Sequence, residues 1–215
     1  TLWGKGWLLQ AAGIVLAAAG LRAIRRNRSF GWPMLATAAL ALAMTPGLSG
    51  HAASVPGKAA LAVLGDTLHV IGAGGWIGTL LLLVAAGIPA AWTLDEGARE
   101  LAVATLVRAF SPIALVFTAV LALTGGLAAW LHLESVAALW QTPYGRTLLL
   151  KLAILSVVAG TGWYNWKKVT PRLETSTGVA LLRRTAAVEL GTAVLVLLVT
   201  AVLVATPPTG PMGPR

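Results

Sequence analysis

The sequence contains no cysteine, and this absence removes three kinds of chemistry. Disulfide bonds, thiolate metal sites and cysteine nucleophiles all require a thiol. Charge is also scarce, since Asp, Glu, Lys and Arg make up only 11% of the 215 residues. Hydrophobic residues make up 57% of the sequence and the mean hydropathy is +0.81. Both values are higher than an ordinary soluble domain needs to form its hydrophobic core. The composition therefore indicates a membrane protein.

Other chemical signatures are missing as well. The sequence has no phosphate-binding glycine loop, no Ser/His/Asp arrangement and no paired catalytic carboxylates, so enzyme activity is not supported. The formal net charge is +9, but no basic motif carries interleaved aromatic residues, and nucleic acid is not an expected partner. The positive charge indicates contact with anionic membrane lipid instead.

Six long apolar runs account for most of the sequence. A helix needs roughly 20 apolar residues to cross a hydrocarbon core about 30 Å thick. None of the runs alternates with the period of a barrel strand, and lipid offers the backbone no hydrogen-bond partners, so the spans should be helices. The predicted fold is an all-α polytopic membrane helix bundle, a single domain over residues 1–215. The predicted helices cover residues 6–24, 32–48, 59–92, 110–131, 147–166 and 185–206.

The third apolar run is too long for one plain crossing. At about 1.5 Å per residue, residues 59–92 would extend roughly 50 Å as a continuous helix. The run contains several glycines and Pro89, which offer places for a tilt or a break. We expect residues 59–65 to form an extension near one surface.

Basic residues are distributed unevenly between the two sides of the predicted bundle. By the positive-inside bias, the richer side is cytoplasmic, and both termini then lie on the outer, periplasmic side of a bacterial inner membrane. The richer side holds 11 basic residues: Arg22, Arg25, Arg26, Arg28, Arg99, Arg108, Lys167, Lys168, Arg172, Arg183 and Arg184. The other side holds 5: Lys5, Lys58, Arg146, Lys151 and Arg215.

The first and last parts of the chain resemble each other. The segment that begins Thr1-Leu-Trp-Gly aligns with Thr142-Pro-Tyr-Gly, and each following helix pair ends in Thr-Pro. This pattern predicts a parallel repeat of residues 1–50 with residues 142–210. Helices three and four have no second copy. Because the chain starts at Thr1 without an initiator methionine, we expect a processed or partial chain, with two further spans before Thr1 in an intact ancestor.

The three histidines all fall on the outer side in this topology. His51 follows the second span in a loop, and His132 lies at the outer end of the fourth. His69 lies inside the third span, one helical turn after Asp66, where an ionisable side chain needs a partner and is a functional candidate. Imidazole suits copper, zinc, iron or nickel, and the thioether of Met44 near the end of the second span would favour Cu(I).

Each of these residues also has a plain structural interpretation. Asp66 can pair with Lys151, and His69 can bond a backbone carbonyl. His51 and His132 can be solvated. If a metal is bound, Asp66 would instead accept a hydrogen bond from the imidazole N–H of His69 and orient the ring.

Other intramembrane polar and aromatic residues are expected to be structural. Glu189 should pair with Arg108, which lies at a similar depth, and a proton or ion relay is the alternative. Asn165 can form a hydrogen bond to a neighbouring helix. Trp76 lies at mid-depth in the membrane, whereas the other tryptophans lie near its boundaries. The GxxxG spacing at residues 74–78 permits close helix packing, which leaves a homo-oligomer open.

Short segments along the chain stand in a particular order: Gly50-His51-Ala52, Asp66-Thr-Leu-His69, Trp76-Ile-Gly78, Arg108-Ala-Phe-Ser-Pro112, Thr142-Pro-Tyr-Gly145, and Leu182-Arg-Arg followed by Glu189. In order and spacing, over essentially the whole chain, they resemble the copper-resistance protein D family (CopD, PcoD and YcnJ-type fusions). The resemblance implies a polytopic inner-membrane protein that takes copper, as Cu(I) or Cu(II), from the periplasm. It also implies a periplasmic copper-binding partner of the CopC type.

The resemblance favours His51 and His69 as copper ligands, with Asp66, Met44 and His132 as additional ligands or supporting residues. A different interpretation is a cytochrome b-like electron carrier, because histidines on neighbouring helices can ligate haem b. Three histidines could supply at most one bis-histidine haem. A third interpretation is a structural subunit of a larger membrane complex.

Overall fold

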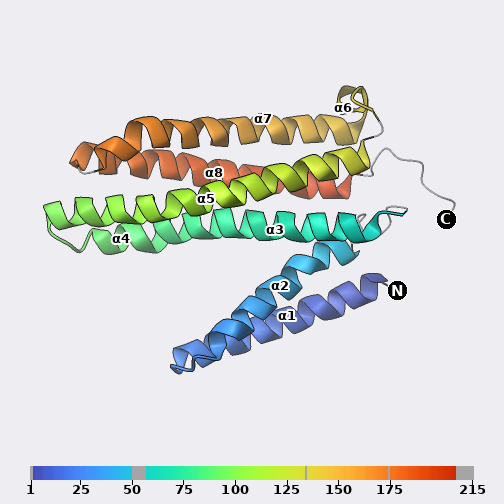
Figure 1. Ribbon diagram of the computed structural model, residues 1–215, viewed down its shortest axis with the longest axis horizontal. Helices are drawn as coiled ribbons and strands as arrows, with labels where there is room; N and C mark the ends of the chain where they lie inside the picture. The colour runs from blue at the N-terminus through green and yellow to red at the C-terminus, as the bar shows by residue number, and fades with distance from the viewer. Residues whose placement is uncertain (1, 50–56, 134, 174, 207–215) are drawn as a thin grey trace. The chain divides into compact units, whose positions relative to one another are not determined.

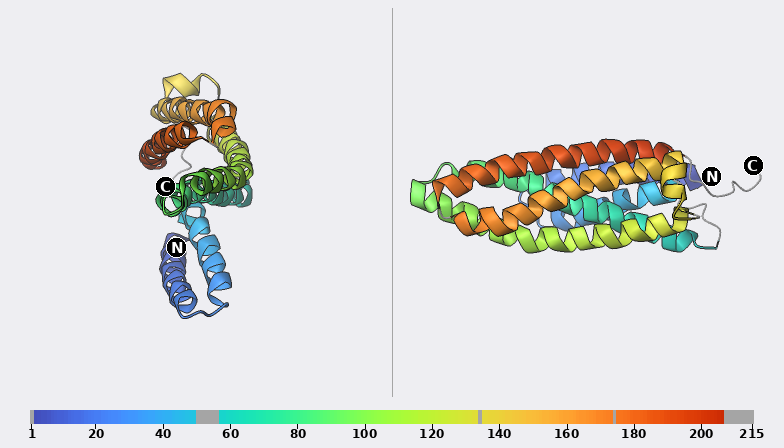
Figure 2. Two further views of the ribbon diagram at one scale, coloured as in Figure 1. Left: turned by 90° about the vertical axis from the view of Figure 1, so that its left-hand side faces the viewer. Right: turned by 90° about the horizontal axis from the view of Figure 1, so that it is seen from above.

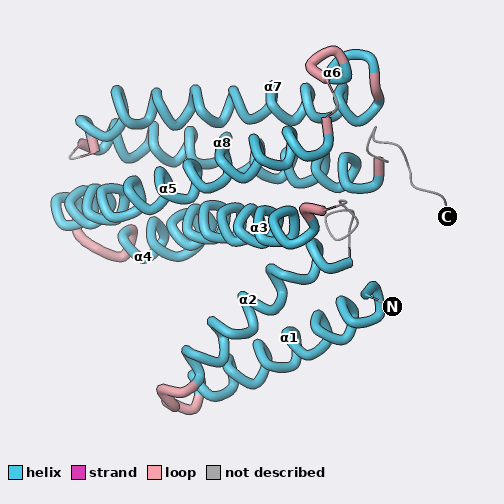
Figure 3. Tube along the Cα trace, turned by 45° about the vertical axis from the view of Figure 1, so that its right-hand side comes forward, coloured by secondary structure: helices cyan, strands magenta, loops and turns pink. Residues whose placement is uncertain are grey.

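The computed structural model describes residues 2–49, 57–133, 135–173 and 175–206. Within these ranges every regular element is a helix, and short loops join the helices (Figure 3). The elements in order are α1 (Leu2–Arg25), α2 (Gly31–Ser49), α3 (Ala59–Leu82), the π-helix η2 (Leu83–Gly87), α4 (Ile88–Ala91), α5 (Glu96–His132), α6 (Ala138–Gln141), α7 (Pro143–Tyr164), the π-helix η3 (Asn165–Val169), the 3₁₀-helix η4 (Thr170–Arg172) and α8 (Ser176–Ala205).

The described residues contain 6 helical stretches that are long and apolar enough to cross a membrane, as the sequence predicts. Leu8, Leu115 and Leu123 are 73%, 71% and 75% exposed, a degree of exposure for large apolar side chains that is expected of a surface facing lipid. The all-helical membrane fold is thereby confirmed. The stretches are Gly6–Arg25, Gly31–Ser49, Ala59–Ala91, Glu96–His132, Pro143–Arg172 and Thr177–Ala205.

Two of the helices begin well before the apolar runs that predicted them. The fourth span begins at Glu96 rather than near residue 110, and the sixth begins at Ser176 rather than near residue 185. Charged side chains on one exposed face of these first turns interrupt an apolar run but not a helix, because the opposite face stays apolar. The apolar residues of these turns join a buried core with residues of η2, α4 and the segment that follows α7: Leu83, Ile88, Ala91, Val103, Ala104, Val107, Val169, Leu173, Val179 and Leu182.

The third span does not break at its glycines. Its helix runs without interruption from Ala59 to Leu82, so the predicted extension at residues 59–65 is part of α3, and widens to a π-turn at Leu83–Gly87 just before Pro89. The same arrangement occurs at Asn165–Val169, just before Pro171. Proline has no N–H to donate to the preceding helical turn, and its ring crowds the backbone of that turn. The wider π-turn accommodates both effects.

The chain forms two compact units, and the first comprises Thr1–Ala73 and Val120–Leu131. Within it, α1 and α2 form an antiparallel hairpin (Figure 1). Glycines recur at every seventh residue of α1 where it faces α2. A Cβ at Gly13 would lie 2.9 Å from the Leu42 side chain, and one at Gly20 would lie 3.1 Å from the carbonyl oxygen of Gly31. The absence of side chains therefore sets the close approach of these helices.

The second unit comprises Gly74–Ala119 and His132–Arg215, and in it α7 and α8 lie side by side (Figure 2). Both helices start with the same kind of N-cap, a threonine. The hydroxyl of Thr142 accepts a hydrogen bond from the backbone N–H of Gly145 at 3.0 Å, and that of Thr175 accepts from Gly178 at 3.2 Å. These N-caps satisfy donors that the first helical turn leaves open.

Candidate metal site

His69 lies in the middle of α3 and contacts the end of α5 within the first unit. Its Nδ1 atom is 2.8 Å from the hydroxyl oxygen of Thr124. Gly125, the next residue on α5, also lies beside the imidazole, and a Cβ there would be in ordinary van der Waals contact with the His69 Cε1 atom at 3.6 Å. The ring is half-buried, and Thr124 is buried. The side chain is therefore held in one orientation by a neighbouring span.

The hydrogen bonds of Thr124 determine which nitrogen of His69 carries the proton. A hydroxyl has a single proton, and Thr124 directs it to the carbonyl oxygen of Val120 at 2.7 Å. With its proton directed there, Thr124 accepts from His69, and this arrangement assigns the hydrogen to Nδ1. In the neutral ring the lone pair is then on Nε2, the arrangement that metal-binding histidines use when their second nitrogen is anchored.

Thr124 is a partner of His69 that the sequence did not single out, and the orienting role of Asp66 stays a prediction. Asp66 is half-buried one turn before His69, and like Lys151 it already has an interaction partner. Thr124 could not be identified from the sequence, because the hydroxyl of a threonine in an apolar run usually forms a hydrogen bond only to the backbone of its own helix.

Met44 lies near the place where α2 meets α3. A Cβ added to Gly47 would lie 3.2 Å from the backbone oxygen of Val63, so the two helices touch there. Met44 precedes this contact by one turn on α2, and Asp66 follows it by one turn on α3. Met44 is half-buried. The thioether and the carboxylate are thus each about one turn from the same crossing.

The predicted ligand His51 lies outside the described residues. Among the residues that the structure does describe, no group of three or more His, Asp or Glu side chains is placed to hold a metal ion. The described part of the candidate site therefore consists of His69 with its anchor Thr124, and Asp66 one turn away.

His132 takes part in a different contact, in the second unit. Its ring stacks on that of Tyr144 with centroids 6.2 Å apart and an interplanar angle of 29°. The histidine at the end of α5 thus packs against the first turn of α7 and helps to fix the loop between them. This contact supports a structural role for His132.

Glu189 is buried on α8 and accepts a hydrogen bond from Asn165. The Asn165 amide nitrogen donates to the carboxylate at 2.7 Å. Arg108 is exposed on α5 and has an interaction partner, and Asn165 opens the η3 turn at the end of α7, the helix packed beside α8. The expected pairing of Glu189 with Arg108 stays a prediction beside this hydrogen bond.

The other amide atom of Asn165 has an unusual environment. Its Oδ1 is buried and has no hydrogen-bond partner among the described residues. An acceptor of this kind beside a carboxylate is what a proton or cation relay would use, so that alternative for Glu189 stays a prediction. Trp76, the remaining mid-depth residue, is buried on α3 and has a packing role.

Comparison with known proteins adds an independent line of argument. The family model described as "Copper resistance protein D" matches residues 104–203, a stretch that includes Thr124, Asn165 and Glu189 but not His69. The copper transport protein CutJ of Bacillus subtilis (strain 168) is 32% identical over 211 residues, which cover 96% of this chain and 37% of CutJ. The chain thus spans little more than a third of that relative. No solved structure matches it.

Proposed function

We propose that this chain, which belongs to the copper resistance protein D family, is a copper-binding membrane protein that mediates copper acquisition or import across the cytoplasmic membrane of a bacterium. Copper is its cargo, and the proposed entry site is on the periplasmic face. No nucleotide-binding motif is present in the sequence, so transport would be passive, ion-coupled or driven by a partner. A periplasmic protein of the CopC type is the proposed copper donor.

The observation that supports this proposal best is the bond between His69 and Thr124. A histidine whose Nδ1–H is anchored presents the lone pair of Nε2 in a fixed direction, which lowers the cost of binding a metal. The proposed second ligand is His51, two positions beyond Ser49, the last residue of α2. Met44, Asp66 and His132 are proposed as additional or supporting residues. A thioether would favour Cu(I) over Cu(II).

Substitution of His69 and Thr124 tests the site. We expect His69→Ala to abolish stoichiometric copper binding by the purified protein, measured by equilibrium dialysis and elemental analysis. Thr124→Val keeps the shape but removes the anchor, and should weaken copper binding by about 10–100-fold, the usual effect of losing a partner of a metal-bound histidine. Thr124→Ser should restore binding, and His132→Ala should have a smaller effect than His69→Ala.

Two further measurements separate the proposal from its alternatives. Because protonated imidazole cannot bind a metal, copper loading should fall as the pH is lowered through the ordinary histidine range near about 6.5. Undiminished loading of the His51→Ala/His69→Ala double variant would refute the site. A Soret band in protein purified from haem-replete cells would support the haem interpretation instead.

A further inference from the structure

The turn between α1 and α2 concentrates positive charge. Arg22, Arg25, Arg26 and Arg28 lie within one short segment, and the first acidic residue anywhere in the sequence is Asp66. The hairpin itself therefore contains no carboxylate that could neutralise the cluster. Four guanidinium groups so close together repel one another, and an anion from outside the hairpin would relieve that repulsion.

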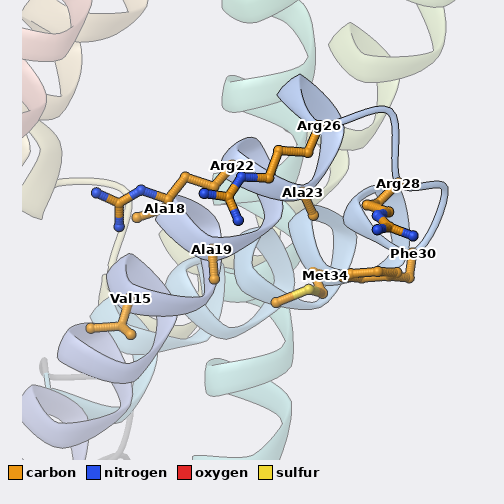
Figure 4. A pocket seen from close by; sticks show the side chains of 9 residues that line it. All are labelled: Val15, Ala18, Ala19, Arg22, Ala23, Arg26, Arg28, Phe30 and Met34. Carbon is orange, nitrogen blue, oxygen red and sulfur yellow. The ribbon is translucent and has the colours of Figure 1, made fainter.

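The structure divides these arginines into two sets. Arg22, Arg26 and Arg28 line an open hollow of about 620 Å³, whereas Arg25 does not line it. Figure 4 shows Arg22 and Arg26 reaching out from successive turns of α1 in a similar direction, with Arg28 coming from the turn.

The remainder of the hollow is apolar. Its wall includes Val15 and Ala19 of α1, Phe30 of the turn and Met34 of α2. The apolar residues of α1 reach about two turns along the helix from the arginines, which themselves stand near its end. The hollow therefore has a cationic end and an apolar flank, the two parts needed to hold a charged headgroup and the start of an acyl chain.

The backbone holds the basic turn in a defined shape. Asn27 has a φ of +58°, in the left-handed region that ends many helices. The N–H of Arg28 donates to the carbonyl of Ala23 at 2.9 Å, and the N–H of Asn27 donates to that of Ile24 at 2.8 Å. This helix-ending motif orders the segment from which Arg26 and Arg28 project, so the cationic end is built before a ligand arrives.

The hollow also lies at the level of the membrane surface. The two apolar stretches that flank it are Gly6–Arg25 and Gly31–Ser49, so the turn between them must stand at the boundary of the hydrocarbon core. Phe30 and Trp32 are 57% and 66% exposed there, as aromatic residues at a headgroup level commonly are.

We propose that this hollow binds one anionic phospholipid, with its phosphate among Arg22, Arg26 and Arg28 and its acyl chain along the apolar wall. Guanidinium groups bind phosphate oxygens in pairs, and basic pockets between spans commonly hold anionic headgroups. The apolar flank favours a lipid over a free phosphate, since inorganic phosphate would gain nothing from it. The site is separate from the proposed copper ligands.

The test compares variants of the whole chain in detergent by native mass spectrometry during titration with dioleoyl-phosphatidylglycerol. Arg25→Gln is the matched control, because it removes the same charge from the same turn but not from the hollow. We expect each of Arg22→Gln, Arg26→Gln and Arg28→Gln to weaken phosphatidylglycerol binding by about fivefold. The triple variant should lose the tightly bound lipid, and Arg25→Gln should retain it.

Two outcomes would overturn the proposal. If Arg25→Gln weakens binding as much as the lining variants do, the lipid responds only to net charge and no specific site exists. If dioleoyl-phosphatidylcholine binds equally well, or if millimolar inorganic phosphate displaces the lipid, the hollow does not recognise an anionic lipid. Unchanged thermal unfolding of each variant in phosphatidylcholine micelles excludes a simple failure to fold.

Discussion

A carboxylate inside a membrane span needs a donor, and Glu189 obtains one from Asn165. An interhelical hydrogen bond of this kind contributes about 0.6 kcal/mol on average in membrane proteins, and at most about 1.7 kcal/mol. The charge distribution along α8 does not reveal the partner, because Asn165 carries no charge and belongs to another helix. A neutral amide is therefore as plausible a partner for an intramembrane acid as an arginine.

The pair can be measured by a double-mutant cycle. We expect Asn165→Ala and Glu189→Leu to show a coupling free energy of about 0.6–1.7 kcal/mol in thermal or denaturant unfolding followed by tryptophan fluorescence. The matched cycle of Glu189→Leu with Arg108→Gln tests the ion pair that the sequence predicts. Coupling near zero with Arg108 would contradict that ion pair, and a larger coupling with Arg108 than with Asn165 would make it the stronger of the two interactions.

At the scale of helices, the starts of α7 and α8 depend on a repeated Thr-x-x-Gly corner. In each corner, the threonine hydroxyl accepts a hydrogen bond from the glycine N–H. The backbone of the segment that precedes the helix packs directly against the glycine. A Cβ on Gly145 would overlap the carbonyl oxygen of Ala138, and one on Gly178 would overlap that of Arg172. The corner therefore needs a residue without a side chain at its fourth position.

Alanine substitution tests this requirement. We expect Gly145→Ala and Gly178→Ala each to lower the free energy of unfolding by about 1–3 kcal/mol, because backbone atoms must move to admit the methyl group. Gly160 and Gly191 are the matched controls, since a Cβ at either would meet nothing within 4 Å. Alanine there should be neutral, or stabilising by up to about 1 kcal/mol through helix propensity. Equal losses at all four positions would contradict the packing argument.

At the scale of the whole molecule, topology remains the main prediction of the charge pattern. The absence of cysteine makes this prediction simple to test, because every introduced thiol is the single reactive one. If the side with more basic residues is cytoplasmic, the α1–α2 turn and its arginine hollow face the cytoplasm. The proposed lipid would then belong to the inner leaflet.

Single cysteines at exposed loop or helix-end positions report the orientation. In intact cells, we expect Ser29→Cys, Glu96→Cys and Lys168→Cys to resist an impermeant maleimide, and Ser135→Cys and Gln141→Cys to react. All five positions are exposed. Labelling after permeabilisation shows that the protected thiols are reactive. The reverse pattern would invert the topology and move the proposed copper entry site to the cytoplasm.

The sequence by itself determined the class of molecule. Six apolar runs without period-two alternation permit only membrane-spanning helices, because lipid cannot satisfy an exposed backbone. The order of short motifs was also enough to predict the copper resistance protein D family, which the comparisons confirm. His69 was identifiable as a candidate from one property, an ionisable group placed inside a span.

Only the tertiary structure decided which residues become partners. The apolar runs are bounded by charged residues, but α5 and α8 begin before the runs that predicted them. Their first turns are helical because they bury one apolar face in a core shared with other segments. The sequence did not single out Thr124, and it predicted a bond across helices for Asn165 without naming the partner. The packing of neighbouring helices makes Thr124 the anchor of His69 and Asn165 the donor to Glu189. Hydrogen bonds across helices depend on packing in three dimensions, which hydrophobic periodicity does not encode.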